Sequence, residues 1–250
     1  MDVIWSAIVE AITMLFGGDA DVWEIIFLSM RVSGVSIVIA MLVGIPLGYY
    51  IGSRRRLGSR FLLILTNTGM GLPPVVAGLT VYIFLSRSGP IAELVVRFLD
   101  TAYAANAPHS EPRMLFTTWA MMIAQVVISA PLVTGVTAAA IGSVPIELRL
   151  QARSLGASGW QEAVLTIKEA RRGVMAAVVA GFGGIISEVG AVMLVGGNIE
   201  GSTRVLTTAI VLETRKGNFE LAMAISIILL SLSFLANVAM LRLQGRTFDE

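Results

Sequence analysis

The sequence predicts an all-α polytopic membrane protein with about five transmembrane helices. Hydrophobic residues make up 56% of the 250 residues and charged residues only 14%, with a mean hydropathy of +0.82. This composition is too apolar for a soluble domain. The apolar residues also form runs that are long enough to cross a bilayer as helices. A formal net charge of +1 argues against a nucleic-acid-binding protein, which would carry a concentrated basic surface.

The N-terminal residues 1–22 are expected to form an interfacial segment. The apolar run 3–16 would span about 21 Å as a helix, which is short of the roughly 30 Å hydrocarbon core. The sequence Gly-Gly-Asp-Ala-Asp then interrupts this run, and Trp23 marks a membrane boundary. If residues 3–16 do cross the membrane, the chain has six spans and begins inside.

The first span is expected at residues 27–52. It carries Gly44, Gly48 and Gly52 at four-residue spacing, which lets a second helix approach closely. The loop that follows contains Arg54, Arg55, Arg56 and Arg60, and the positive-inside rule places this loop in the cytoplasm.

The second span, residues 61–86, is predicted to be a broken helix. The stretch from Asn67 to Pro74 contains two glycines followed by Pro73 and Pro74, and the prolines lack the N–H donors that a regular helix needs. A broken helix persists in lipid only where protein buries it or where it lines a cavity. We therefore expect this stretch beside a translocation path. The alternative is a simple proline kink that serves packing.

Residues 87–113 are polar and are expected to form an external loop. The chain's one histidine, His109, lies in this loop without Asp, Glu or Cys companions at ligand spacing, so no metal site is predicted. The third span, residues 115–141, then returns the chain to the cytoplasm.

Residues 144–173 form the longest polar segment between hydrophobic runs that has helix-forming patterns of its own. Their sequence predicts two short amphipathic helices. Pro145 suits the beginning of the first helix, and Gly156 suits its C-terminal cap. Ser158 and Gln161 have the spacing of a capping box, which would begin the second helix. The predicted apolar stripes, at helical spacing, consist of Leu148, Ala152 and Leu155 and then of Trp160, Val164 and Ile167.

The fourth span, residues 174–197, is rich in glycine and holds Glu188 near its centre. A charged group at such depth is costly and usually faces a bundle interior or a water-filled cavity, so a functional role is the first expectation. The alternative is a protonated or hydrogen-bonded packing residue at a subunit interface. The last span is expected at residues 219–241.

Between these spans, residues 198–217 bring hydroxyl groups and a guanidinium together. Thr203, Arg204, Thr207 and Thr208 would lie within about a turn and a half of helix, and these groups suit a polyoxygenated anion. The structural alternative is an external amphipathic helix in which Arg204 pairs with Glu200 or Glu213.

The distribution of Lys and Arg gives the expected topology. These residues are more numerous in the loops on the side of segment 144–173 than on the other side, although the other side has the greater total loop length. With five spans, the N-terminus is outside and the C-terminus is cytoplasmic. Residues 23–242 form one transmembrane domain, and residues 243–250 form a cytoplasmic tail.

Several motifs resemble those of one transporter family. Residues 151–158, Gln-Ala-Arg-Ser-Leu-Gly-Ala-Ser, resemble the EAA loop of ABC importer permeases, the cytoplasmic helix-turn-helix that docks on the ATP-binding subunit. The match is partial, because Leu150, Gln151 and Ala152 stand where the family often has Glu-Ala-Ala. An ordinary amphipathic hairpin on the membrane surface is the alternative. The resemblance implies docking through Ala152, Arg153, Leu155, Gly156, Ala157 and Ser158.

Further motifs narrow the resemblance to oxyanion permeases. Residues 72–78 look like the Leu-Pro-Pro motif of molybdate and sulfate permeases, and residues 187–191 and 197–199 resemble their Gly-Glu-Phe-Gly-Ala and Gly-Asn-Ile segments. Residues 190–217 are most similar to the tungstate branch. The resemblance implies tungstate as substrate, with molybdate or sulfate as alternatives. Along the substrate path we place Asn67, Pro73, Pro74, Glu188, Asn198, Thr203, Arg204 and Thr207, with anion contacts from Thr203, Arg204 and Thr207.

The family implies the type I ABC importer permease fold in the cytoplasmic membrane, surrounded by lipid. The expected complex contains a second copy of this chain, two ATP-binding subunits and an extracytoplasmic oxyanion-binding protein. ATP and Mg²⁺ would bind the partner subunits and no cofactor would bind this chain, which lacks a Gly-x-x-x-x-Gly-Lys-Ser/Thr phosphate loop. Transport would proceed by alternating access, and the chain would not be an enzyme.

Two other classes of protein fit the sequence less well. An intramembrane enzyme needs a nucleophile and a base that face each other, but the spans contain no Asp and the one histidine lies in a loop. A stand-alone secondary transporter would not need the cytoplasmic hairpin, and the two glycine-rich spans share no repeat pattern. Co-purification with an ATPase subunit separates this last class from an ABC permease.

Overall fold

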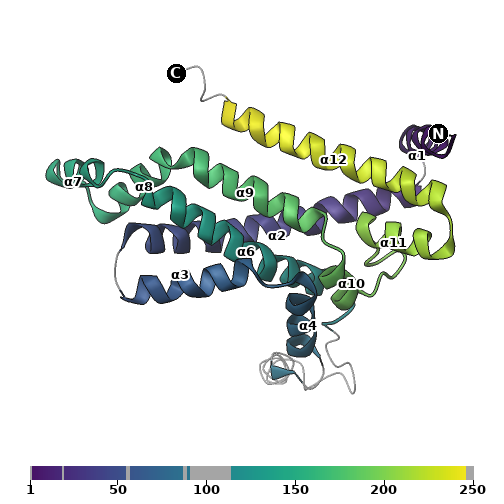
Figure 1. Cartoon of the computed structure of the whole chain (residues 1–250), viewed down its shortest axis with the longest axis horizontal. Helices are drawn as coiled ribbons and strands as arrows, with labels where there is room; N and C mark the ends of the chain where they lie inside the picture. The colour runs from purple at the N-terminus through teal and green to yellow at the C-terminus, as the bar shows by residue number, and fades with distance from the viewer. Residues whose placement is uncertain (1, 19, 55–56, 87–88, 91–113, 246–250) are drawn as a thin grey trace, which may run out of the picture. The chain divides into compact units, whose positions relative to one another are not determined.

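The computed structural model describes residues 2–18, 20–54, 57–86, 89–90 and 114–245, and the elements within these ranges are helical (Figure 1). The predicted external loop, including His109, lies almost entirely outside the described residues. The helices are α1 (Asp2–Phe16), α2 (Ala20–Ser53), α3 (Leu57–Met70), α4 (Pro74–Leu85), α6 (Thr118–Gly142), α7 (Ile146–Ser154), α8 (Gly159–Glu169), α9 (Arg171–Ile186), α10 (Gly190–Gly196), α11 (Leu206–Lys216) and α12 (Phe219–Gly245).

The lengths and composition of these helices confirm the predicted fold class. Among the described residues, α2, α6 and the stretch Phe219–Met240 of α12 are long and apolar enough to cross a membrane, and the interrupted pairs α3–α4 and α9–α10 raise the number of candidate spans to as many as five. The apolar part of α1, Trp5–Phe16, is shorter than a span. Helix α2 begins at Ala20, ahead of the boundary expected at Trp23.

The predicted break in the second span is confirmed. Helix α3 ends at Met70, and α4 begins at Pro74 with Pro73 in an extended conformation (φ −59°, ψ 131°) as its N-cap residue. The N–H of Leu72 still finds a partner, the carbonyl oxygen of Gly69 at 3.2 Å. The two prolines therefore sit where their missing donors cost least, at the start of a new helix.

The fourth span, predicted at residues 174–197, is interrupted, which was not predicted from the sequence. Residues 187–189 separate α9 from α10. The carboxylate of Glu188 accepts a hydrogen bond from the N–H of Ala191 at 2.9 Å, and the hydroxyl of Thr207 donates to the carbonyl oxygen of Glu188 at 3.0 Å. Side chains thus satisfy two backbone groups that the break would otherwise leave without partners.

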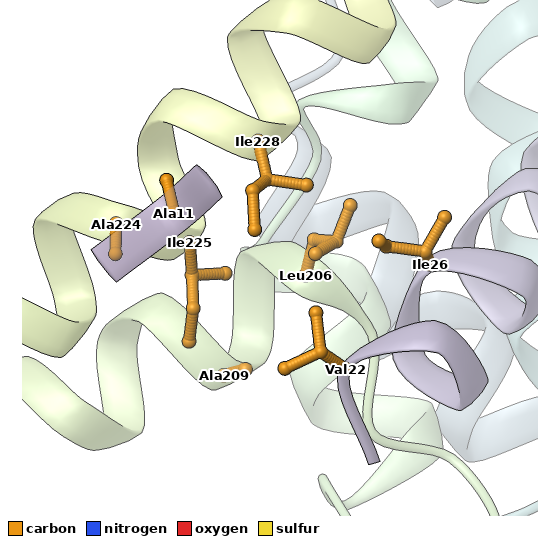
Figure 2. Packing of buried hydrophobic residues seen from close by; sticks show 8 residues of the cluster. All are labelled: Ala11, Val22, Ile26, Leu206, Ala209, Ala224, Ile225 and Ile228. Carbon is orange, nitrogen blue, oxygen red and sulfur yellow. The ribbon is translucent and has the colours of Figure 1, made fainter. Parts of the chain in front are cut away.

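The chain divides into two compact units. The first unit contains residues 1–33, 73–125 and 186–232, and the second contains residues 34–72, 126–185 and 233–250. In the first unit, helices α1, α2, α11 and α12 contribute to one apolar cluster (Figure 2). Its buried members are Ala11, Val22, Ile26, Leu206, Ala209, Ala224, Ile225 and Ile228.

The glycine face predicted on the first span is confirmed within the second unit. A Cβ atom added at Gly48 would lie 2.7 Å from Cβ of Thr137, and one added at Gly44 would lie 2.9 Å from Cγ1 of Val133. Helices α2 and α6 therefore approach closely along this face and run side by side in Figure 1.

Candidate functional site

Segment 144–173 forms the predicted helical hairpin, and its first corner is a glycine cap. Helix α7 begins directly after Pro145. Gly156 has φ +87°, its N–H donates to the carbonyl oxygen of Arg153 at 3.0 Å, and the N–H of Ala157 donates to the carbonyl oxygen of Ala152 at 3.0 Å. These two bonds make a Schellman motif, which favours glycine at the left-handed position. The predicted role of Gly156 as the C-terminal cap of the first hairpin helix is confirmed.

The second helix of the hairpin begins with the predicted capping box. The hydroxyl of Ser158 accepts from the N–H of Gln161 at 3.3 Å, and the side-chain carbonyl of Gln161 accepts from the N–H of Ser158 at 2.8 Å. Two backbone donors at the beginning of α8 are satisfied in this way. Both ends of the corner 155–158 are thus fixed by local hydrogen bonds.

The two predicted apolar stripes of the hairpin are not fully buried, because one large side chain of each is exposed. Leu155 is 88% exposed and Trp160 is 78% exposed, and α7 contains no buried residue. The corner therefore presents large apolar side chains to its surroundings. Exposed apolar groups on a fixed backbone are typical of a surface that docks a protein or lies on a membrane.

The hairpin is instead held by a buried carboxylate, that of Glu162 in α8, whose side chain is only 1% exposed. The guanidinium of Arg149 reaches Oε1 through Nε and Nη2, each at 2.7 Å. The guanidinium of Arg153 reaches Oε2 through Nε and Nη2, each at 2.6 Å. Each carboxylate oxygen therefore accepts a charge-assisted hydrogen bond from Nε and lies within ion-pair distance of Nη2 of the same guanidinium.

The electrostatic surroundings of Glu162 favour its ionised form. Burial raises its pKa and is the largest single influence, but the hydrogen bonds from Arg153 and Arg149, together with their charges, outweigh burial and hold the pKa below its ordinary value. Glu162 therefore carries a full negative charge at neutral pH, and that charge compensates the partly buried guanidinium of Arg149.

Glu162 was not predicted as a functional residue from the sequence. A signal was available, because Arg149 and Arg153 are four residues apart and so lie on the same face of α7. Two like charges on one face call for a shared counter-ion. The candidates in the second helix were Glu162 and Glu169, and only the fold could select between them.

The hydroxyl groups predicted to contact an anion are engaged by the backbone. Thr203 is fully buried, donates to the carbonyl oxygen of Gly196 at 2.5 Å and accepts from the N–H of Ile199 at 3.0 Å. The hydroxyl of Thr207 is the one bonded to Glu188, as described above. Thr203 and Arg204 also precede α11, which begins at Leu206, so the predicted shared turn of helix is wrong for these two residues.

Two side chains of the predicted path retain unused polar atoms. Arg204 pairs with Glu200 at 3.2 Å, which confirms one of the two pairings expected for it, and its Nε is buried without a hydrogen-bond partner among the described residues. Asn198 has φ +53°, and its Oδ1 is likewise buried without such a partner. These atoms could bind a ligand.

The remaining residues of the predicted substrate path lie in both compact units. In the first unit, Pro73 and Pro74 are exposed and Glu188 is half-buried. Asn67 is exposed on α3 in the second unit. Within the described ranges, no group of three or more His, Cys, Asp or Glu side chains could hold a metal ion.

The described helices have the lengths and composition of a polytopic membrane protein, and the hairpin α7–α8 exposes an apolar corner. Residues 44–249 match the family described as "Binding-protein-dependent transport system inner membrane component", and the chain belongs to this family. It is therefore a multi-pass inner-membrane permease of the ABC transporter class, a non-catalytic transmembrane subunit. The predicted family resemblance is confirmed.

Individual relatives agree with this assignment. The chain is 37% identical over 224 residues to a "Probable anion ABC transporter permease protein" of Haloferax volcanii, covering 88% of this chain and 89% of that one. It is 37% identical over 245 residues to "Tungstate uptake system permease protein TupB" of Peptoclostridium acidaminophilum, covering 98% and 99%. A crystal structure of a bacterial ABC transporter involved in the import of the acidic polysaccharide alginate matches with a TM-score of 0.72 at 19% identity, covering 95% and 83%, and supports the fold alone.

Proposed function

We propose that this chain is the permease subunit of an ABC importer for tungstate. The observation that carries the proposal is the 37% identity to a tungstate permease along almost the full length of both chains. Molybdate and sulfate, which share the tetrahedral, doubly negative form of tungstate, are the alternative substrates. No cofactor is proposed for this chain.

The hairpin α7–α8 is the proposed docking element for an ATP-binding subunit. Its corner is fixed by the Schellman motif and the capping box, and it exposes Leu155 and Trp160. We propose a complex of two copies of this chain, two ATP-binding subunits and an external oxyanion-binding protein. The N-terminus lies outside and the C-terminus inside, and residues 23–242 form the transmembrane domain. ATP would bind the partner subunits, and their closure would move the hairpins and reorient the cavity between the two copies.

The first test of the coupling role is the variant Gly156→Val. At φ +87° a β-branched residue is strained by about 1–2 kcal/mol, although no atom crowds the site. The equilibrium between the native corner and its alternative conformations would then shift roughly 5–30-fold against the native corner. We expect tungstate-stimulated ATPase activity to fall strongly in liposomes that contain the chain, its ATP-binding subunit and the binding protein.

The matched control is Gly156→Asn, because asparagine tolerates the left-handed conformation. We expect this variant to retain most of the stimulation. Equal activity of both variants would contradict the coupling role of the corner. Stimulation of the wild type by molybdate or sulfate but not by tungstate would replace tungstate with that anion. Failure of the wild-type chain to bind an ATPase subunit would favour a stand-alone transporter.

Arg204 is the proposed anion contact, because it is the side chain on the predicted path with both a positive charge and an unused buried donor. Replacing it by alanine is expected to reduce tungstate uptake about tenfold, the usual scale for losing a hydrogen bond to a charged group. Arg215→Ala is the control, since it removes the same charge from an exposed position on α11. Equal uptake by the two variants would show that Arg204 does not contact the anion.

A further inference from the structure

Arg149 joins three helices of the second unit. Its Nε and Nη2 bind Glu162 in α8, as described above, and its Nη1 donates to the carbonyl oxygen of Ser53 at 3.0 Å. Ser53 is the last residue of α2. One guanidinium on α7 therefore contacts both the other helix of the hairpin and the end of a membrane-spanning helix.

The contact with Ser53 is chemically favourable for α2. The last carbonyl groups of a helix have no partner within that helix, and together they carry a partial negative charge. A cation that donates to one of these groups both satisfies it and interacts well with the helix dipole. The side chain of Arg149 is only 14% exposed, so this contact is weakly screened by water.

Arg153 provides an internal comparison. It binds the other oxygen of the same carboxylate, but it is 62% exposed and makes no contact with α2 among those found in the described residues. The two arginines thus share one counter-ion and differ in whether they reach α2.

The rest of the hairpin reaches α2 by another route. Ile167 of α8 packs against the buried cluster of Ile141, Ala170 and Val174, which Tyr49 of α2 also contacts. This apolar contact involves the far end of α8. Helix α7 has no buried residue, and the hydrogen bonds of Arg149 connect it to both α8 and the end of α2.

We propose that Arg149 is a positioning residue that passes movement of α7 to the C-terminal end of α2, and that Glu162 holds its guanidinium in place for this purpose. The proposal rests on the proposed docking of the hairpin on an ATP-binding subunit. It assigns the polar link between the docking corner and the first membrane span to one side chain. Lysine could not replace it, because a single ammonium cannot present the fixed fork that bonds Glu162 and Ser53 together.

The test compares Arg149→Lys with Arg171→Lys in the full complex in liposomes. Both variants keep the charge, and Arg171 is an exposed arginine at the start of α9, outside the docking corner and the Glu162 network. Two quantities are measured: binding of the ATP-binding subunit, and tungstate imported per ATP hydrolysed. We expect both variants to bind the subunit, and we expect import per ATP to fall about tenfold in Arg149→Lys alone.

Amide hydrogen exchange at residues 48–54 supplies a readout that does not depend on transport. We expect faster exchange at this end of α2 in Arg149→Lys than in Arg171→Lys, because the link to α7 is lost. Unchanged exchange and unchanged import per ATP in Arg149→Lys would overturn the proposal. Equal losses in the two variants would also overturn it, because the losses would then not depend on the contact of Arg149 with Ser53.

These outcomes are separable from a failure of the proposed function. If the wild-type chain binds no ATP-binding subunit, docking itself is refuted, and the transmission role falls with it. If docking and tungstate import are intact in the wild type and Arg149→Lys behaves like the wild type, only the role of Arg149 is refuted.

Discussion

Replacing Glu162 by leucine is expected to open the hairpin α7–α8 at neutral pH. The substitution leaves the guanidinium of Arg149, which is only 14% exposed, without its counter-ion. Removing one partner of a buried ion pair costs about 3–5 kcal/mol. Amide exchange in α7 and α8 should therefore become roughly two to four orders of magnitude faster, within the limit set by global unfolding.

The control for this variant is Arg153→Gln, which removes the exposed partner of the same carboxylate. An exposed ion pair contributes only about 0–1 kcal/mol, so exchange should change little. Similar exchange rates in Glu162→Leu and Arg153→Gln would show that the buried carboxylate does not hold the hairpin.

The same residue gives the hairpin a defined dependence on pH. Because the pKa of Glu162 is lowered in the folded hairpin, the ionised carboxylate stabilises it fully above the ordinary glutamate value of about 4.3. This stabilisation is lost as the pH falls from that value through the lowered pKa. Exchange in the wild-type hairpin should accelerate over this acid range, and the corresponding acceleration should be absent from Glu162→Leu.

Replacing Gly78 by alanine is expected to destabilise the packing of α4 on α10. The added Cβ atom would lie 2.5 Å from Cα and 2.9 Å from Cβ of Ala191, so one backbone must move. Overpacking of this kind costs about 1–3 kcal/mol. A lower thermal unfolding temperature in detergent would report the loss.

Gly34→Ala is the matched control, because no atom lies within 4 Å of its added Cβ. In a helix interior this change is expected to stabilise by about 0.5–1 kcal/mol. The two substitutions are chemically identical, but they should change the unfolding temperature in opposite directions. A rise in unfolding temperature for Gly78→Ala would show that α4 and α10 are not packed as closely as described.

The sequence predicted the features that depend on neighbours within a few residues. The apolar runs predicted a membrane protein with about five spans, and Pro73 and Pro74 predicted the break between α3 and α4. The Schellman cap at Gly156 and the capping box at Ser158 were also predicted. Each of these features is set by local backbone geometry, so the residue types and their spacing are sufficient.

Family motifs carried the functional prediction further than composition or periodicity could. Residues 151–158 indicated an ABC importer permease and residues 187–191 indicated an oxyanion permease, and the family assignment and relatives of the chain agree. Composition alone would have ended at a membrane protein with a polar hairpin, because many transport functions share that description.

Only the tertiary structure decided which polar side chains are bonded within the protein, and to which partners. Thr203, which looked available to an anion, is fully buried and bonded to backbone groups. Glu162, which appeared ordinary, is the buried counter-ion of two arginines, one of which also reaches Ser53 at the end of α2. These roles depend on which helices meet, because partners far apart in the sequence are brought together by packing, and neither residue type nor spacing along the chain encodes that meeting.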